Sequence, residues 1–152
     1  MEKERIVGEL SKDYILSLVE EDETIIALDP GDITGIAKLL RVCYITHSAI
    51  YTELINELIP QLVGYPGMKI VAEEFVTRPS GFYKTQYAGR VCGIFDYWCC
   101  TNRVPLIYQQ PQAIKTMIPG AIDLKMAGWE WRTKHEMDAI RHGIYYLLTR
   151  NK

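Results

Sequence analysis

Apolar residues in the first half of the chain fall into short runs whose length and composition predict β-strands. The run at 24–29 is rich in β-branched and aliphatic residues and ends at Asp29, just before a Pro-Gly turn. Two further runs follow at 35–40 and 42–48, and Gly35 is expected to let the chain reverse between the first two strands. Because such short turns join antiparallel neighbours, the three strands are predicted to form a meander.

Wider apolar spacing later in the chain predicts helices that alternate with two more strands. Apolar residues three and four apart at 49–62 predict a helix that stops near Pro60. The run at 69–76 predicts a fourth strand, which a crossover helix would place parallel to the first. The remaining patterns predict a helical segment at 11–22, a helix at 85–100, a strand at 104–108 and a final helix at 134–149.

This order of elements predicts an α/β fold, with a mixed five-stranded sheet flanked by helices. Three antiparallel strands would be followed by two parallel ones. A chain of 152 residues has the length of one ordinary domain. We therefore expect a single domain over 1–152, with an extra N-terminal helical segment at 1–22.

Composition places the chain among water-soluble globular proteins. Hydrophobic residues make up 48% and charged residues 24%, and no apolar run approaches the length of a membrane span. The first residues are charged throughout, unlike a secretory signal peptide. Cysteines at 43, 92, 99 and 100 lack the spacing of a zinc site, so buried, reduced thiols in a cytoplasmic protein are expected.

Charge is distributed unevenly along the sequence. Residues 1–75 contain 6 Lys and Arg against 14 Asp and Glu, whereas residues 76–152 contain 11 against 5. A basic second half is typical of a surface that faces a polyanion, although a solvated face would produce the same bias.

Acidic residues interrupt the apolar pattern at the ends of two predicted neighbouring strands. Asp29 follows the first strand, where an Asp-Pro-Gly turn alone is equally typical of a metal ligand and of an ordinary turn. Glu73 lies in the fourth strand, where an unpaired carboxylate would be costly to bury. Parallel pairing would bring Glu73 close to Asp29, while strand alternation would turn Glu74 to the opposite face.

The last predicted helix begins with a second polar group. His135 and Asp138 are three residues apart and share one face, above an apolar stripe. His135 could bind an ion, orient a water molecule or cap the helix, and His142 is interpreted as a packed or surface residue. Three carboxylates and an imidazole that converged here would suit two divalent ions about 4 Å apart.

Three motifs in this order resemble those of the RuvC-type Holliday junction resolvases, in the RNase H-like superfamily, and in particular its short phage-encoded members. They are DPGDITG at 29–35, VAEEF at 71–75 and HEMDAIRHG at 135–143. AGRVCGIF at 88–95 and QQPQAIKTMIPG at 109–120 resemble the family's intervening segments. Any one motif is weak, but all of them in order are fairly specific.

The resemblance implies an endonuclease that resolves four-way DNA junctions with paired nicks. It implies Asp29, Glu73, His135 and Asp138 as catalytic and metal-binding residues that hold two Mg²⁺ or Mn²⁺ ions. It also implies a homodimer, since a junction has two equivalent strands across a two-fold axis. Neither a nucleotide cofactor nor a membrane is implied.

Residues that contact DNA are expected in the basic second half. The resemblance places Lys115 close to DNA, whereas Lys125 lies near but not at a second lysine position of the family. The family's wedge aromatic corresponds to Val76, so the nearest rings become the candidates for stacking at the junction. The full set of expected DNA-binding residues is Lys115, Lys125, Arg78, Lys84, Arg90, Phe75, Phe82 and Tyr83.

Two other functions fit the same residues. One is an RNase H-like nuclease for flaps, other branched DNA or RNA, because this acidic cluster serves many nucleases. The other is a junction-binding protein without catalytic activity. DPGDITG also resembles the phosphate hairpin of actin-like and sugar kinases, but those folds need two such domains and 152 residues argue against them.

Overall fold

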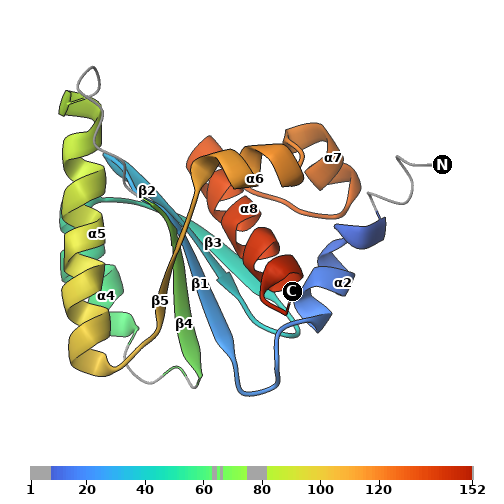
Figure 1. Ribbon diagram of the computed structural model, residues 1–152, viewed down its shortest axis with the longest axis horizontal. Coiled ribbons are helices and arrows are strands. Elements are labelled where there is room, and N and C mark those ends of the chain that lie inside the picture. The colour runs from blue at the N-terminus through green and yellow to red at the C-terminus, as the bar shows by residue number, and fades with distance from the viewer. Residues whose placement is uncertain (1–7, 63–64, 66, 75–81, 152) are drawn as a thin grey trace.

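The five strands in the described part of the chain form one mixed sheet, as the sequence predicts, and their order is β3-β2-β1-β4-β5 (Figure 1). The computed structural model describes residues 8–62, 65, 67–74 and 82–151. An antiparallel meander joins β1 (Thr24–Asp29), β2 (Ile33–Leu39) and β3 (Tyr44–Ile50). On the other side of β1, β4 (Met68–Glu73) and β5 (Leu106–Gln109) run parallel to it.

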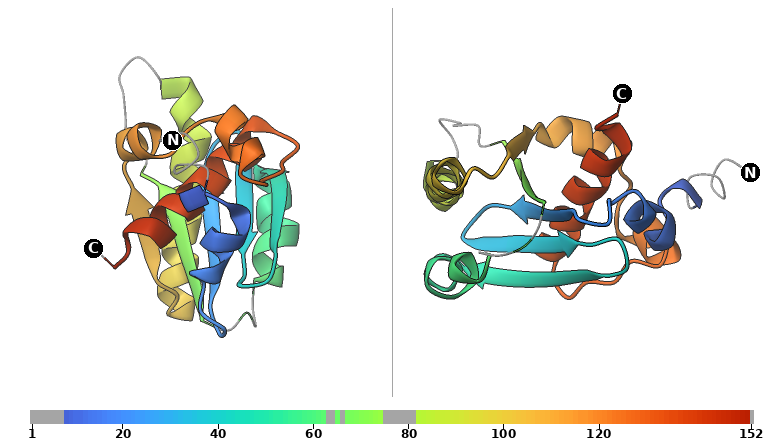
Figure 2. Two further views of the ribbon diagram at one scale, coloured as in Figure 1. Left: turned by 90° about the vertical axis from the view of Figure 1, so that its right-hand side faces the viewer. Right: turned by 90° about the horizontal axis from the view of Figure 1, so that it is seen from below.

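Helices cover both faces of this sheet, as Figures 1 and 2 show. One face carries α5 (Phe82–Asn102) and a short helical segment made of α3 (Tyr51–Glu53), a π-helix (Leu54–Leu58) and α4 (Ile59–Gln61). The opposite face carries α2 (Lys12–Ser17), α6 (Pro111–Met117), α7 (Ala121–Met126) and α8 (Lys134–Thr149). No helix among the described residues is both long and apolar enough to span a membrane.

Strand alternation divides the apolar residues between two cores. On β1, Ile25 and Ala27 face a core that includes Ile140 of α8, whereas Ile26 and Leu28 face one that includes Phe95 of α5. Because β1 is buried on both faces, its residues from Ile25 to Leu28 are all apolar, and Asp29 follows them.

The N-terminal helix is shorter than the predicted 11–22. It spans Lys12–Ser17, and the chain then turns into a buried ion network around Glu23. The Glu23 carboxylate accepts hydrogen bonds from Arg150 at 2.7 and 2.8 Å and from Lys69 at 2.6 Å. Burial by itself would raise the pKa of Glu23, but hydrogen bonds from Arg150, Lys69 and the Glu20 amide outweigh it and lower this pKa. We call Glu23, Lys69 and Arg150 the Glu23 network.

The helix expected at 49–62 begins at Tyr51 and contains a π-helical turn in its middle, over Leu54–Leu58. The next residues include Pro60, which has no backbone N–H to donate. Wide turns of this kind absorb such an interruption without ending the helix. The chain stays helical through Gln61, and the helix ends close to Pro60 as expected.

All four cysteines are free thiols, but only two are buried as expected. Cys92 and Cys99 lie in the core under α5, where burial, with the charge of Asp96 adding to it, raises the pKa of both thiols to about 11. Cys43 and Cys100 are exposed. The predicted burial was wrong for these two because one lies in the turn before β3 and the other on the outer side of α5.

Candidate active site

Two carboxylates leave the same edge of the sheet, at the ends of β1 and β4. The parallel register pairs Leu28 with Ala72, so Asp29 and Glu73 come next on adjacent strands. Glu74 already lies beyond the strand, where its amide donates to the Gln109 carbonyl at 2.8 Å and its carboxylate accepts from the Gln110 side chain. As expected, only Glu73 of the two joins Asp29.

Gly35 lies inside β2, opposite Asp29, and not at a chain reversal as the sequence suggested. Glycine is needed at this position because the backbone of α8 approaches it closely. A Cβ atom at Gly35 would stand 1.9 Å from the carbonyl oxygen of His135 and 2.9 Å from the amide nitrogen of Glu136. Only glycine leaves this space free, so it lets the start of α8 lie against the strand that flanks Asp29.

The start of α8 is held in place by a capping arrangement that also reaches β3. Thr133 precedes the helix, and its hydroxyl accepts a hydrogen bond from the Glu136 amide at 3.2 Å. The buried Glu136 carboxylate in turn accepts from the Ser48 hydroxyl of β3 at 2.8 Å. Burial would raise the pKa of Glu136, yet the surrounding hydroxyls lower it. A charged, hydrogen-bonded Glu136 thus fixes the helix start against the sheet.

One face of α8 carries polar side chains that lie close to the ends of β1 and β4. His135 Nδ1 lies 3.3 Å from Asp29 Oδ2, and the His135 side chain remains 43% exposed. Asp138 follows one turn later and pairs with Arg141 at 3.5 Å. Arg141 also donates to the Ile118 carbonyl at 2.6 Å, which connects this turn of α8 to the end of α6.

His142 is packed, which is one of the two expected alternatives, and it also belongs to the same cluster. Its side chain is 2% exposed, and its Nε2 lies 3.3 Å from Glu73 Oε2. One ligand atom each from Asp29, Glu73 and His142 lie within 4.8 Å of one another, so these three residues could hold a metal ion. The spacing from His135 and Asp138, seven and four residues, is the sequence signal that could have revealed it.

A hydrogen bond from the other ring nitrogen of His142, Nδ1, fixes the orientation of the imidazole. Nδ1 lies 2.9 Å from the side-chain oxygen of Gln109, at the end of β5, and donates to that oxygen. In a neutral imidazole Nε2 then presents its lone pair toward the Glu73 carboxylate, whereas an imidazolium would donate to it. A lone pair that faces a carboxylate is unfavourable without a cation or proton between them, whereas a metal-binding histidine commonly has this second hydrogen bond. The donor set therefore fits a divalent cation.

Negative charge is concentrated at Asp29. Burial, together with the charges of Asp138 and Glu73, raises the pKa of Asp29 to about 6, although the hydrogen bond with His135 opposes this shift. Carboxylates this close to one another repel in the absence of a cation, which is a common property of metal and catalytic sites.

The expected basic residues that the structure describes are exposed and come from three helices. Lys115 lies in the last turn of α6, Lys125 in the last turn of α7 and Arg90 in α5. Each of the last two contacts a ring: Arg90 lies 5.3 Å from the Tyr87 centroid and Lys125 5.6 Å from that of Trp131. In Figure 1, α6 and the start of α5 flank the end of the molecule where α8 begins.

Five expected DNA contacts cannot be placed with their side chains. Phe82, Tyr83 and Lys84 form the first turn of α5, but their side chains lie outside the described part of the chain. Phe75 and Arg78 lie outside the described residues altogether.

Comparison with known proteins identifies the architecture. No protein-family model and no curated protein sequence matches the chain. Among solved structures, T. thermophilus RuvC in complex with Holliday junction substrate superposes with a TM-score of 0.65, over 85% of this chain and 96% of that one. The chain has a RuvC-like fold. At 14% identity the likeness to RuvC is one of fold, including the mixed sheet on which Asp29 and Glu73 lie side by side.

Proposed function

We propose that this protein is a metal-dependent, structure-selective DNA endonuclease that cuts four-way junctions. The observation that carries the proposal is the convergence of Asp29, Glu73 and His142 at the ends of adjacent strands, on a RuvC-like fold. The matched RuvC is in complex with a Holliday junction substrate, which makes junction DNA the first substrate to test.

The chemistry of the donor atoms suits Mg²⁺ or Mn²⁺. Asp29, Glu73 and His142 would hold one ion, and Asp29 would share a second with Asp138. Carboxylate oxygens suit both metals, while the imidazole favours Mn²⁺. When bound, such ions activate water and stabilise the charge that develops on the phosphate.

The protein's own groups would position the substrate and move the proton. His135 is the exposed member of the cluster, and the contact between its Nδ1 and Asp29 leaves Nε2 free to take a proton from a water molecule. Asp29 would hold the imidazolium that results. Hydrolysis in this arrangement leaves a 3′-hydroxyl and a 5′-phosphate. The buried Gln109 keeps His142 in one orientation throughout.

DNA would lie across the end of the sheet, between α5 and the pair α6 and α7. Lys115, Lys125 and Arg90 are exposed there and would contact phosphates, which makes binding steeply dependent on salt. A homodimer would present one site to each of two equivalent strands and so give paired nicks.

Cleavage of a four-way junction by the wild type and by Asp29→Asn tests this proposal. Metal-dependent paired nicks are expected for the wild type, and loss of cleavage with retained binding for the variant. Asp32→Asn is the matched control, because Asp32 is exposed three residues further along the same turn. Undiminished cleavage by Asp29→Asn would overturn the site. Parallel reactions with a flap, a duplex and an RNA–DNA hybrid measure junction selectivity, and no cleavage of any substrate would refute a nuclease.

A further inference from the structure

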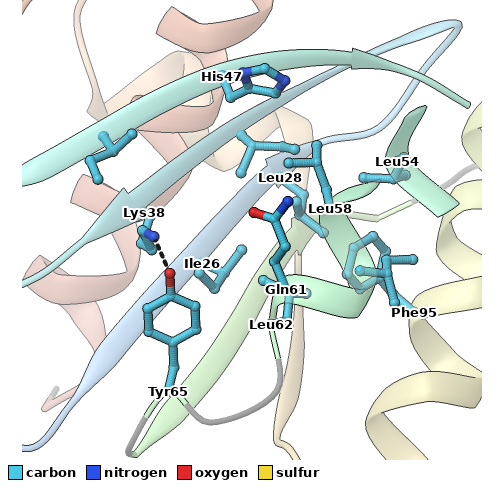
Figure 3. Close-up of a pocket in the computed structure, with 13 residues that line it drawn as sticks. Ile26, Leu28, Lys38, His47, Leu54, Leu58, Gln61, Leu62, Tyr65 and Phe95 are labelled. Atoms are coloured by element: carbon cyan, nitrogen blue, oxygen red, sulfur yellow. Dashed lines mark hydrogen bonds between the residues drawn. The ribbon is translucent and has the colours of Figure 1, made fainter. Parts of the chain in front are cut away.

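An apolar cavity lies on the face of the sheet opposite α8 (Figure 3). It has a volume of about 200 Å³ and opens between the sheet and the short helical segment at 51–61. Its inner wall consists of fully buried side chains, Ile26 and Leu28 from β1, Leu54 from the π-helix and Phe95 from α5. It is separate from the Asp29 cluster, since none of the cluster residues lines it.

A π-helical turn borders the cavity. It spans Leu54–Leu58 and spaces its side chains differently from an α-helix. π-Helical turns are frequently found at functional sites. Leu54 and Leu58 both line the cavity, and Figure 3 shows them on the side away from Lys38.

Lys38 is the unusual member of the lining. The strand registers pair it with Ile26 on one side and Ile45 on the other, so a lysine stands in the middle of an apolar row. It is half-buried, and its Nζ donates to the Tyr65 hydroxyl at 2.6 Å, 4.3 Å from the centre of that ring (Figure 3). No carboxylate pairs with Lys38 within the described residues, and the nearby Glu53 carboxylate is bound to His47 at 2.8 Å.

The polar groups are thus arranged to recognise an anion at the mouth of an apolar space. A lysine ammonium that is partly withdrawn from water gains most from a carboxylate partner. The Tyr65 hydroxyl accepts its hydrogen bond from Lys38, so its own hydrogen is left to donate to the same carboxylate.

We propose that this cavity binds a small anionic amphiphile, a carboxylic acid whose apolar part fills the space and whose carboxylate meets Lys38 and Tyr65. An apolar protein cavity of about 150 Å³ takes up a benzene-sized molecule. A space of about 200 Å³ therefore suits a body of roughly six to eight carbon atoms. This site does not depend on the nuclease proposal.

Binding is tested with two acids and one neutral compound on the full chain without DNA. Octanoate and 3-phenylpropionate distinguish an aliphatic from an aromatic body, and octan-1-ol lacks the charge. Methyl resonances of Leu54 and Leu58 should shift on titration with at least one of the acids. That acid should bind about tenfold more tightly than the alcohol.

Two variants separate the roles of charge and space. Lys38→Met should remove the tenfold preference for the acid while alcohol binding persists. Leu58→Trp should fill the cavity and abolish binding of all three compounds, with the methyl resonances of Ile140 and Ile144 in the other core as the control for folding. The proposal is overturned if neither acid shifts the cavity methyls, if Lys38→Met keeps the preference, or if a folded Leu58→Trp still binds.

Discussion

Replacing Gly35 by alanine should disturb the proposed active site through a backbone contact. The added Cβ would stand 1.9 Å from the His135 carbonyl oxygen and 2.2 Å from its carbonyl carbon, whereas real Cβ contacts stay above 3.0 Å. The groups it meets are backbone atoms at the start of α8, so no side-chain rotation can relieve the overlap. The start of α8 must therefore move away from β2 by roughly 1 Å.

A movement of this size would displace His135 relative to Asp29, on which the proposed chemistry depends. His135 lies at the point of contact, and its Nδ1 faces Asp29 at 3.3 Å. Misplacing a catalytic group by about 1 Å costs on the order of 100-fold in rate. The movement would also strain the bond from Ser48 to Glu136, and overpacking of this kind destabilises a protein by about 1–3 kcal/mol.

Two measurements on the purified variant check this reasoning. Single-turnover cleavage of a four-way junction should slow about 100-fold while junction binding changes little. Urea unfolding should report a loss of about 1–3 kcal/mol. Gly93→Ala is the matched control, because a Cβ there meets nothing within 4 Å and alanine in a helix interior stabilises by up to about 1 kcal/mol. Wild-type stability together with wild-type cleavage in Gly35→Ala would refute the argument.

Three further outcomes are expected. Glu23→Gln should lower the free energy of unfolding by about 3 kcal/mol at pH 7, because it leaves the cations of the buried Glu23 network unpaired, whereas Glu21→Gln at an exposed position should not. Folding lowers the pKa of Glu23, so the charged carboxylate stabilises the protein fully above pH 4.5, and this stabilisation is lost as pH falls through the lowered pKa. In urea unfolding from pH 7 to acid, the difference in free energy of unfolding between wild type and Glu23→Gln should therefore shrink. Gln109→Leu should weaken Mn²⁺ binding by about 10–100-fold in calorimetry, since His142 loses the acceptor that orients its ring, and unchanged affinity would contradict the proposed ligand. Trp129→Phe should cost about 1–3 kcal/mol in thermal unfolding, because its buried indole N–H donates at 2.8 Å to the backbone of the N-terminal segment.

Local sequence patterns predicted the architecture correctly, and they predicted which strand ends carry the acidic side chains of the candidate site. Apolar runs, turns and helical spacing depend on neighbouring residues, so the mixed sheet and the final helix at Lys134–Thr149 could be predicted directly. The adjacency of Asp29 and Glu73 followed because parallel strands bring their ends to one edge. Asp138, whose charge helps to raise the pKa of Asp29, was anticipated from its helical spacing to His135.

Features that depend on distant contacts could be assigned only in three dimensions. Gly35 looked like a turn residue, but its role is to admit the backbone of His135, a hundred residues away in sequence. His142 resembled an ordinary buried histidine until β4 and β5 placed Glu73 and Gln109 on its two nitrogens.

The short N-terminal helix and the place of Lys38 in the cavity also involve residues far apart in the sequence. The chain leaves the helix after Ser17, and Glu23 then contacts Arg150, near the other end of the sequence. Lys38 stands on an apolar face because strand registers place it between two isoleucines. The sequence by itself determined the order of elements and the acidic strand ends, since these depend on local periodicity. Tertiary structure decided which histidine completes the cluster and where space remains, since these depend on packing between residues far apart in the chain.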